Sequence, residues 1–561
     1  MRRRARTAPA MALILTAVAQ GTSQGAPVES ENPRLLLFLT IDQARYDYLV
    51  RFRGLFEGGL KLLLDEGVVF TDAHQNHAIT STAPGHAALA TGLYPSHSGM
   101  INNRWYDRAS QSRMYSVQDS ASAVLRAESL YTDAATENAS SGRSPRNLLA
   151  TTLADWIKEQ NPESKAYSAG GKDRAAITMG GKSSDAVLWY DLRTGQFVTS
   201  RYYMKEYPPW LEAFHERRIP DSHFGKAWEP LPVAPSAYKA CGIEKLDQGV
   251  FDWSLPHPLG SSQFTPDSSF YSAFYNSPYL DAYLVELAKT LMAHESLGKD
   301  SALDFLALAF STVDTVGHAY GPNSPEVLDA VLRLDRALGE LFRFVDETVG
   351  MEHVAVALSA DHGVMPLPEY LRKRNLEGRR FATEDILCFQ GAERKLDQTF
   401  GEDDWLLREL YINYEAIGRH NVRRQEVEET LARFIEKCPG VEKVWTRTSL
   451  ESSSGEEDPF REMFLRSFHP HRSPDLLIQL KPFHISRLGR STTHGSPYPY
   501  DTHVPLIVRF PGVPPAVISE RIDTVDLAPT LASLLEVRAP GGLDGVDRSP
   551  LLRWGGHGAK D

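Results

Sequence analysis

The stretch RLLLFLTID, residues 34–42, is an apolar run that ends abruptly at a carboxylate, Asp42. Two later runs end in the same way: DFLALAFSTVD reaches Asp314, and VAVALSADHG passes Asp361 and His362. A fourth run, PLIVRFP at 505–511, instead follows the polar segment THGSPYPYDTH. Near-continuous apolar strands are typical of a sheet buried on both faces, which is usually parallel. We therefore predict a doubly wound α/β fold with a mostly parallel central sheet, in which ligands bind beyond the carboxyl ends of the strands.

The clearest helical pattern lies between two of these runs. Ser324 and Pro325 are a suitable cap and first-turn residue, and apolar side chains recur from Val327 to Val345 with helical spacing. Two long stretches, 187–300 and 366–490, fit the alternation of strand and helix poorly. We expect both to be insertions that build the rim of a site.

Residues 1–26 have the pattern of a secretory signal peptide, with early arginines, an apolar run from Ala10 to Ala19, and small residues up to Ala26. The apolar run is too short to cross a bilayer comfortably. We therefore expect a periplasmic or secreted protein that is not inserted in the membrane and that acts as a monomer.

The formal net charge of −12 is opposite in sign to that of a typical nucleic-acid-binding protein. A site for an anionic substrate must therefore supply its own positive charge. The chain has three cysteines, which allow one disulfide, but the sequence does not say which two of Cys241, Cys388 and Cys438 pair. Their spacing excludes a zinc ribbon, so any metal must be held by histidines and carboxylates.

Candidate metal ligands follow the predicted strands. Asp314 and His318 are four residues apart, so one helical turn places them on one face. On its own, the Asp314 and His318 spacing could be a pair on a helix surface, and the Asp in the DHG segment could simply form a turn. Their common placement beyond separate strands instead predicts one centre, and mixed imidazole and carboxylate ligands suit zinc or a similar divalent ion. The six candidates are Asp42, Asp314, His318, Asp361, His362 and His494.

The segment TSTAPGH, residues 80–86, presents three hydroxyls ahead of a run of small residues. A hydroxyl is a weak nucleophile that needs a base or a metal, and the chain has no G-x-S-x-G elbow. Thr82 is also a reasonable helix N-cap, and a helix N-terminus itself favours anionic oxygens, so the two readings are compatible. The spacing does not choose among Thr80, Ser81 and Thr82.

Phosphate-binding groups have candidates in two loops. In SAGGKDRAAI, Lys172 and Arg174 lie one residue apart after a Gly-Gly turn, where they would clamp a phosphate or form a solvated surface turn. Asn103, in INNRWYD, would donate its amide to an anion or occupy a turn.

Taken in order, these segments resemble the alkaline phosphatase superfamily, specifically its phosphate-irrepressible, PafA-like branch. The nucleotide pyrophosphatases/phosphodiesterases are the related branch outside it. The blocks are TIDQARYDYL, TSTAPGHAALATGLYPSHSGMINNRWYD, GGKDRAAI, STVDTVGHAYGP, SADHGVMP and THGSPYPYDTHVPL, with the closing DTVDLAPTLASLLEV and GLDGVDRSPLL. The resemblance covers residues 33–550 and implies an alkaline-phosphatase-like α/β domain with two zinc ions per chain.

The resemblance also assigns roles. It implies that Thr82 is the nucleophile and a ligand of the zinc ion held by Asp42, Asp361 and His362. It assigns Asp314, His318 and His494 to the second zinc, and Asn103, Lys172 and Arg174 to the phosphoryl oxygens; His503 fits a ligand position less well.

The implied activity is hydrolysis of small phosphate monoesters through a phospho-threonine intermediate by a secreted alkaline phosphatase. The alternative is a phosphodiesterase or nucleotide pyrophosphatase with the same metal site. A clamp formed by Lys172 and Arg174 favours a monoester, whose dianion carries one more charged oxygen than a diester. A sulfatase is disfavoured because position 82 is neither Cys nor Ser, and the full ligand set disfavours a protein that only binds zinc or phosphate.

Overall fold

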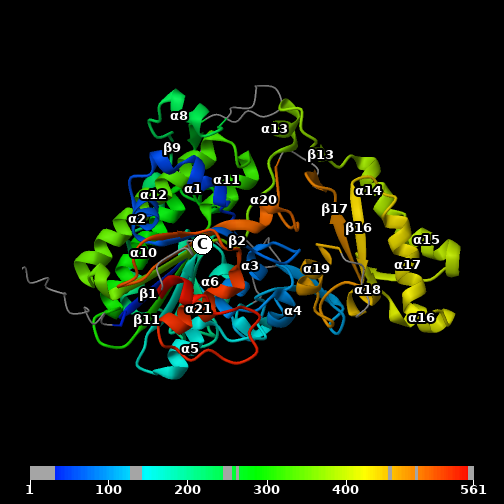
Figure 1. The fold of residues 1–561 in the computed structure, drawn as a ribbon, viewed down its shortest axis with the longest axis horizontal. Coiled ribbons are helices and arrows are strands. Elements are labelled where there is room, and N and C mark those ends of the chain that lie inside the picture. Colours follow the sequence, from blue (N-terminus) through cyan, green and yellow to red (C-terminus); the bar gives the residue numbers. More distant parts are fainter. Residues whose placement is uncertain are drawn as a thin grey trace, which may run out of the picture. The chain divides into compact units, whose positions relative to one another are not determined.

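A mixed sheet is the centre of the fold (Figure 1). The computed structural model describes residues 32–126, 142–243, 255–260, 265–452, 458–486 and 491–553, so the predicted signal peptide lies outside the described residues. Within these ranges the sheet has eleven strands in the order β20-β2-β19-β12-β1-β11-β6-β7-β8-β5, with β21 paired to β2. The strands are β1 (Leu35–Ile41), β2 (Val68–His74), β5 (Val124–Leu125), β6 (Ala166–Gly170), β7 (Ala186–Asp191), β8 (Gln196–Ser200), β11 (Asp304–Phe310), β12 (Val354–Ser359), β19 (His503–Arg509), β20 (Ala516–Ile518) and β21 (Ile522–Asp523).

The direction of the strands confirms the prediction of a mostly parallel sheet. The five neighbouring strands β12, β1, β11, β6 and β7 are parallel. β19 runs antiparallel to both of its neighbours, β12 and β2. The first residues of β19 therefore lie at the edge where β12 ends, which explains why a polar segment precedes this strand instead of following it.

Both faces of the sheet are covered, as the apolar runs predict. All seven residues of β1 are buried, and they alternate between two hydrophobic cores. Leu35, Leu37 and Leu39 pack with α2 (Gly59–Glu66), α10 (Tyr279–Glu295) and α12 (Pro325–Thr348). Leu36 and Phe38 pack with α5 (Leu153–Gln160) and α21 (Leu527–Leu534). Each fully buried leucine or phenylalanine contributes about 1.5–3 kcal/mol, so this double coverage holds the sheet in place.

The predicted helix is α12. The Ser324 hydroxyl caps it by accepting a hydrogen bond from the Val327 amide, and Pro325 is its first residue. The apolar stripe from Val327 to Val345 is buried. No helix in the described ranges is long and apolar enough to cross a membrane.

The stretch 187–300, which we expected to be an insertion, belongs to the main fold at both of its ends. It begins in the sheet, with β7 and β8, and it ends in α10, which packs against the sheet. Several of the aromatic residues that set this stretch apart are core residues: Phe197 and Tyr190 contact Tyr283 of α10. Composition alone did not separate these buried aromatic residues from those of an insertion.

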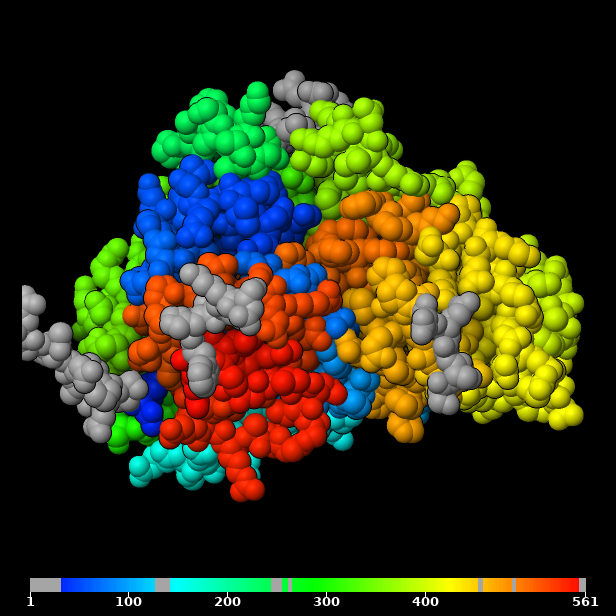
Figure 2. Space-filling model, viewed as in Figure 1, coloured from blue at the N-terminus to red at the C-terminus, as the bar shows by residue number. Residues whose placement is uncertain are grey.

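The stretch 366–490 has a hydrophobic core of its own. This core joins α15 (Ala392–Phe400), α16 (Tyr414–His420), α17 (Arg424–Ile435), β16 (Val441–Thr446) and β17 (Leu476–Leu480). A disulfide between Cys388 and Cys438 ties α14 (Thr383–Gln390) to the turn that follows α17, while Cys241 is buried and free. The yellow and orange residues of this stretch form one continuous mass in the space-filling view (Figure 2).

Candidate active site

The ends of three parallel strands bring the predicted metal ligands to one edge of the sheet. Asp42 directly follows β1, and Asp361 and His362 follow β12 after one residue. Helix α11 (Thr312–Tyr320) begins two residues after β11 and carries Asp314 and His318. The predicted helical turn is present, with His318 Nε2 3.2 Å from Asp314 Oδ1.

His494 reaches the same edge of the sheet by a different route, because it precedes an antiparallel strand instead of following a parallel one. It lies ahead of α20 (Pro499–Thr502) and of the antiparallel strand β19. Its Nδ1 hydrogen-bonds to the Thr80 carbonyl at 2.7 Å, which leaves Nε2 3.8 Å from Asp314 Oδ1. The antiparallel direction of β19 is therefore what delivers this histidine to the strand ends.

The six side chains form two groups of three. Within each group, the ligand atoms lie within 4.8 Å of one another. Asp42, Asp361 and His362 form the first cluster, and Asp314, His318 and His494 form the second cluster. The His362 and His494 rings stack, with centroids 3.5 Å apart and planes 18° apart. A metal ion lies in the plane of the imidazole that binds it, so stacked rings offer their lone pairs to two different ions. The stacking therefore fits two adjacent metal positions.

Unpartnered buried atoms support the same reading. His362 Nε2 lies 3.6 Å from Asp42 Oδ1, and neither atom has a hydrogen-bond partner among the described residues. Burying such groups unpaired is costly, whereas a cation between them would satisfy both. The donor set of carboxylates and imidazoles suits a divalent ion such as zinc.

Lys172 supplies positive charge between the clusters. Its Nζ lies 2.7 Å from Asp42 Oδ2 in the first cluster and 2.5 Å from Asp314 Oδ2 in the second. Burial, together with the negative charges of Asp314 and Asp361, raises the pKa of Asp42 well above its ordinary value. At Asp314 the effect of burial is outweighed by Lys172 and His318, so the pKa of this carboxyl lies well below its ordinary value.

The two stacked histidines are held in the form that binds metals. Burial, and then the positive charges of His362 and His318, lowers the pKa of His494 well below its ordinary value. Burial likewise lowers the pKa of His362. Neutral imidazole is the ligating form, so these environments favour coordination.

The three hydroxyls of residues 80–82 have different partners. Thr80 Oγ1 donates to the Ser496 carbonyl at 3.0 Å, and Ser81 Oγ donates to the Asn102 side chain at 3.2 Å. Thr82 is buried at the first position of α3 (Thr82–Thr91), and Arg174 Nη2 donates to its Oγ1 at 3.2 Å. Of the three, only the Thr82 hydroxyl contacts a predicted phosphate-binding residue in the described part of the chain.

The capping role considered for Thr82 belongs to other residues. Ser81 occupies the N-cap position, and the Asn103 side-chain oxygen accepts the hydrogen bond of the Ala83 amide at 2.9 Å. Asn103 thereby lies beside the N-terminus of α3. Thr82 Oγ1 is left with Arg174, at a helix terminus where an anionic oxygen is stabilised.

Gln43 is a site residue that the sequence did not point to. Its backbone N–H donates to Asp361 Oδ1 at 3.0 Å, and its side-chain Nε2 donates to Asp314 Oδ1 at 2.8 Å, so it holds one carboxylate of each cluster. Its φ of 68° lies in the left-handed region that side chains rarely adopt. Gly317 leaves room for it, because a Cβ there would lie 1.9 Å from Gln43 Oε1. A glycine inside the pattern DTVGH was the one available signal of such a close approach.

His86 is a second such residue. It is fully buried, and its Nδ1 lies 2.9 Å from the Thr82 carbonyl and 3.2 Å from Asp361 Oδ2. Its Nε2 contacts Thr40 Oγ1 at 3.0 Å. The ring therefore links the candidate nucleophile to the first cluster, although its sequence position in TSTAPGH looks like part of the helix alone.

His503 lies outside both clusters, in a group with Asp72 and His74. Its ring stacks on that of His74 with planes 12° apart, and its Nε2 hydrogen-bonds to the Thr71 carbonyl at 2.9 Å. Both nitrogens of His74 already have protein partners, Asp72 Oδ1 at 2.9 Å and Thr502 Oγ1 at 3.1 Å, so we assign no metal to this group.

Comparisons with known proteins show what this chain is similar to. Residues 36–496 match the family model described as type I phosphodiesterase / nucleotide pyrophosphatase. The chain is 30% identical over 537 residues to alkaline phosphatase PhoV of Synechococcus elongatus, covering 94% of each chain. It is also 30% identical over 525 residues to alkaline phosphatase PafA of Elizabethkingia meningoseptica, covering 91% of this chain and 93% of that protein. The crystal structure of wild-type PafA aligns with a TM-score of 0.81 at 28% identity, over 93% of this chain and 99% of that one.

Proposed function

This chain belongs to the type I phosphodiesterase / nucleotide pyrophosphatase family, and we propose that it is an alkaline phosphatase of the PafA-like branch that hydrolyses phosphate monoesters. One observation carries the proposal: two carboxylate–imidazole clusters lie side by side, next to a buried threonine whose hydroxyl contacts an arginine. The similarity to PhoV and PafA over nearly the whole chain supports the same activity.

The residues of the chain have distinct parts in the reaction. Thr82 Oγ attacks the phosphorus as the bond to the leaving oxygen breaks, and the alcohol departs with a proton. Water then cleaves the phospho-threonine, which releases phosphate and restores the hydroxyl. Arg174 holds the phosphoryl oxygens through its planar guanidinium, and Asn103 and Lys172 add further donors.

Two divalent ions, zinc by the chemistry of the donors, would be held by the two clusters and would supply positive charge to both the attacking and the leaving oxygen. The stacked His362 and His494 rings support one ion per cluster. We also propose that the protein is exported, because residues 1–26 read as a signal peptide, and that it works as a monomer.

The alternative activity is hydrolysis of phosphodiesters, which the name of the matching family model favours. The pair of buried Lys172 and half-buried Arg174 argues for monoesters, because two cations match the dianion better than the single charge of a diester. Rates on p-nitrophenyl phosphate and on its bis-ester separate the two activities. A wild-type preference for the bis-ester would overturn the proposal.

The nucleophile and the metals are tested on the same preparation. We expect about two zinc ions per chain, loss of activity on chelation and recovery with zinc. Acid-quenched enzyme should carry phosphate on Thr82. Thr82→Ala should lose most turnover, whereas the matched controls Thr80→Ala and Ser81→Ala should be mild. Label on another residue, or full activity without metal, would contradict the proposal.

A further inference from the structure

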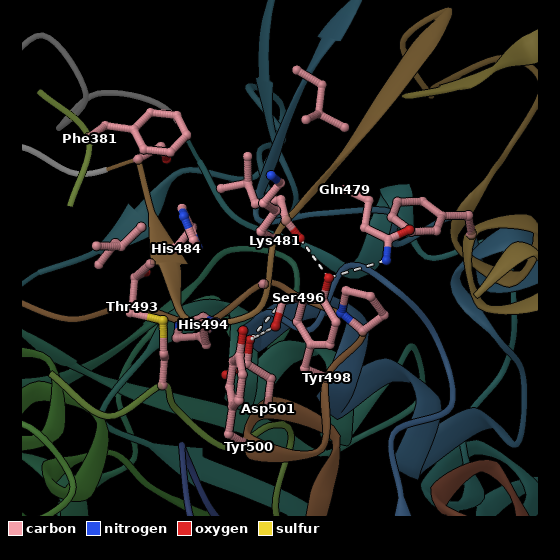
Figure 3. A pocket seen from close by; sticks show the side chains of 18 of the residues that line it. Phe381, Gln479, Lys481, His484, Thr493, His494, Ser496, Tyr498, Tyr500 and Asp501 are labelled. Carbon is pink, nitrogen blue, oxygen red and sulfur yellow. Dashed lines mark hydrogen bonds between the residues drawn. The ribbon is translucent and has the colours of Figure 1, made fainter. Parts of the chain in front are cut away.

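A cavity of about 400 Å³ lies between the stretch 366–490 and the loop that carries His494. In Figure 3, Phe381 and His484 stand on one side of it, Gln479 stands opposite, and His494, Tyr498 and Tyr500 lie below. Its walls are mainly apolar, and five phenylalanine and tyrosine rings line it: Phe381, Phe389, Phe464, Tyr498 and Tyr500. Pockets for small organic ligands combine this kind of wall with a few polar groups, at volumes of about 300–1,000 Å³.

His494 belongs both to this cavity and to the second cluster. The loop around it is fixed to the nucleophile's turn by two hydrogen bonds: His494 Nδ1 to the Thr80 carbonyl at 2.7 Å, and Thr80 Oγ1 to the carbonyl of Ser496, which also lines the cavity. The cavity therefore begins at the wall of the candidate site.

The direction of the reaction points the substrate's organic group towards the cavity. In an in-line displacement, the attacking and leaving oxygens lie on opposite sides of the phosphorus. With Thr82 attacking from the side of the first cluster, the leaving oxygen lies on the side of the second cluster. The group attached to that oxygen then faces His494 and the space beyond it.

We propose that this cavity receives the organic group of the substrate, and that the preferred substrates are phosphate monoesters whose alcohol carries an apolar aromatic ring. The inference rests on the proposed function, since it assigns the leaving side of the same site. Small polar alcohols would leave the aromatic walls uncovered.

The test compares 2-phenylethyl phosphate with ethyl phosphate, because their alcohols have similar acidity and the chemical step is matched. Wild-type kcat/KM should favour the phenyl compound by about 10- to 100-fold, the value of burying one phenyl group. The corresponding phosphonates, titrated calorimetrically into Thr82→Ala, should differ in affinity in the same direction.

Adjacent residues on α14 offer a matched pair of variants. Ile386 lines the cavity, whereas Leu387 is 56% exposed. Ile386→Trp fills the cavity and should reduce the preference to about threefold or less, while Leu387→Trp should leave it unchanged. Phe389→Ala, which removes one aromatic wall, should lower the preference as well and keeps the test decisive if the tryptophan perturbs the fold.

The outcomes separate the two proposals. Hydrolysis of both compounds at equal kcat/KM, or equal effects of the two tryptophan variants, would overturn the assignment of the cavity and leave the phosphatase proposal intact. Failure to hydrolyse ethyl phosphate and the phenyl compound alike would overturn the phosphatase proposal itself.

Discussion

Gly317→Ala should weaken the site while leaving the fold as stable as before. The added Cβ would lie 1.9 Å from Gln43 Oε1, about half an ordinary contact distance, so the Gln43 side chain must move. The movement breaks the 2.8 Å hydrogen bond from Gln43 Nε2 to the Asp314 carboxylate. Gly317 lies within α11, where alanine is the better helix former by about 1 kcal/mol.

The expected magnitude follows from the lost bond. A hydrogen bond to a charged group is worth about 1.5–3 kcal/mol, which corresponds to about 10- to 150-fold in affinity or rate. Loss of a residue that orients a metal ligand typically lowers metal affinity or activity by about 10- to 100-fold. The two estimates agree, so zinc affinity and kcat/KM should both fall by about one to two orders of magnitude.

The assay measures zinc affinity by chelator competition, kcat/KM on a monoester, and the melting temperature of the metal-free protein. Gly418, within α16, is the control, because a Cβ there meets nothing within 4 Å. Gly418→Ala should stabilise its helix without changing the site. Gln43→Gly should also weaken zinc binding, although it relieves the strain of a φ of 68°. Wild-type zinc affinity and kcat/KM in Gly317→Ala would refute the role of Gln43.

Three further outcomes are expected. Lys172→Ala and Arg174→Ala should each cost about 10- to 100-fold on monoesters and less on diesters, so equal losses on both would mean that the pair only supports the fold. Replacing Cys388 and Cys438 by alanine opens a link between residues 50 apart and should lower the unfolding free energy of that stretch by about 4 kcal/mol in urea titrations, with zinc content unchanged. Burial raises the pKa of Asp281 to about 7, so its contribution to stability is present below pH 4 and is lost as the pH rises through 7. Asp281→Asn should flatten the dependence of unfolding free energy on pH between 4 and 8, and an unchanged slope would contradict the shift.

The sheet was predictable because its central strands have a distinctive sequence pattern. The runs at 34–42, 304–314 and 354–363 are apolar on both faces and end in carboxylates, a pattern that favours a buried parallel strand with a site at its end. The helix pair Asp314 and His318 was predictable from spacing alone, since four residues are one helical turn.

What escaped prediction depends on contacts between distant segments. Gln43 and His86 have no distinctive spacing, and their importance comes from polar contacts with Asp361 and Asp314, about 270 to 320 residues away. The disulfide depends on how α14 and α17 pack, which three cysteine positions do not reveal. We expected the start of the stretch 187–300 to be part of a rim insertion because aromatic residues such as Tyr190 suit a buried core as well as a rim.

The position of β19 has a consequence for how the chain is made. This strand lies between β12 and β2 in the sheet, yet it is synthesised after both. Until residue 509 has left the ribosome, β12 and β2 each present an unpaired edge on the sides that β19 will occupy. Unpaired edges are sites of association between chains, and non-local pairing of this kind is slow. From the completion of β12 at Ser359 until β19 (His503–Arg509) is made, the growing chain therefore lacks the strand that joins β12 to β2, and this strand is also the one that brings His494 to the site.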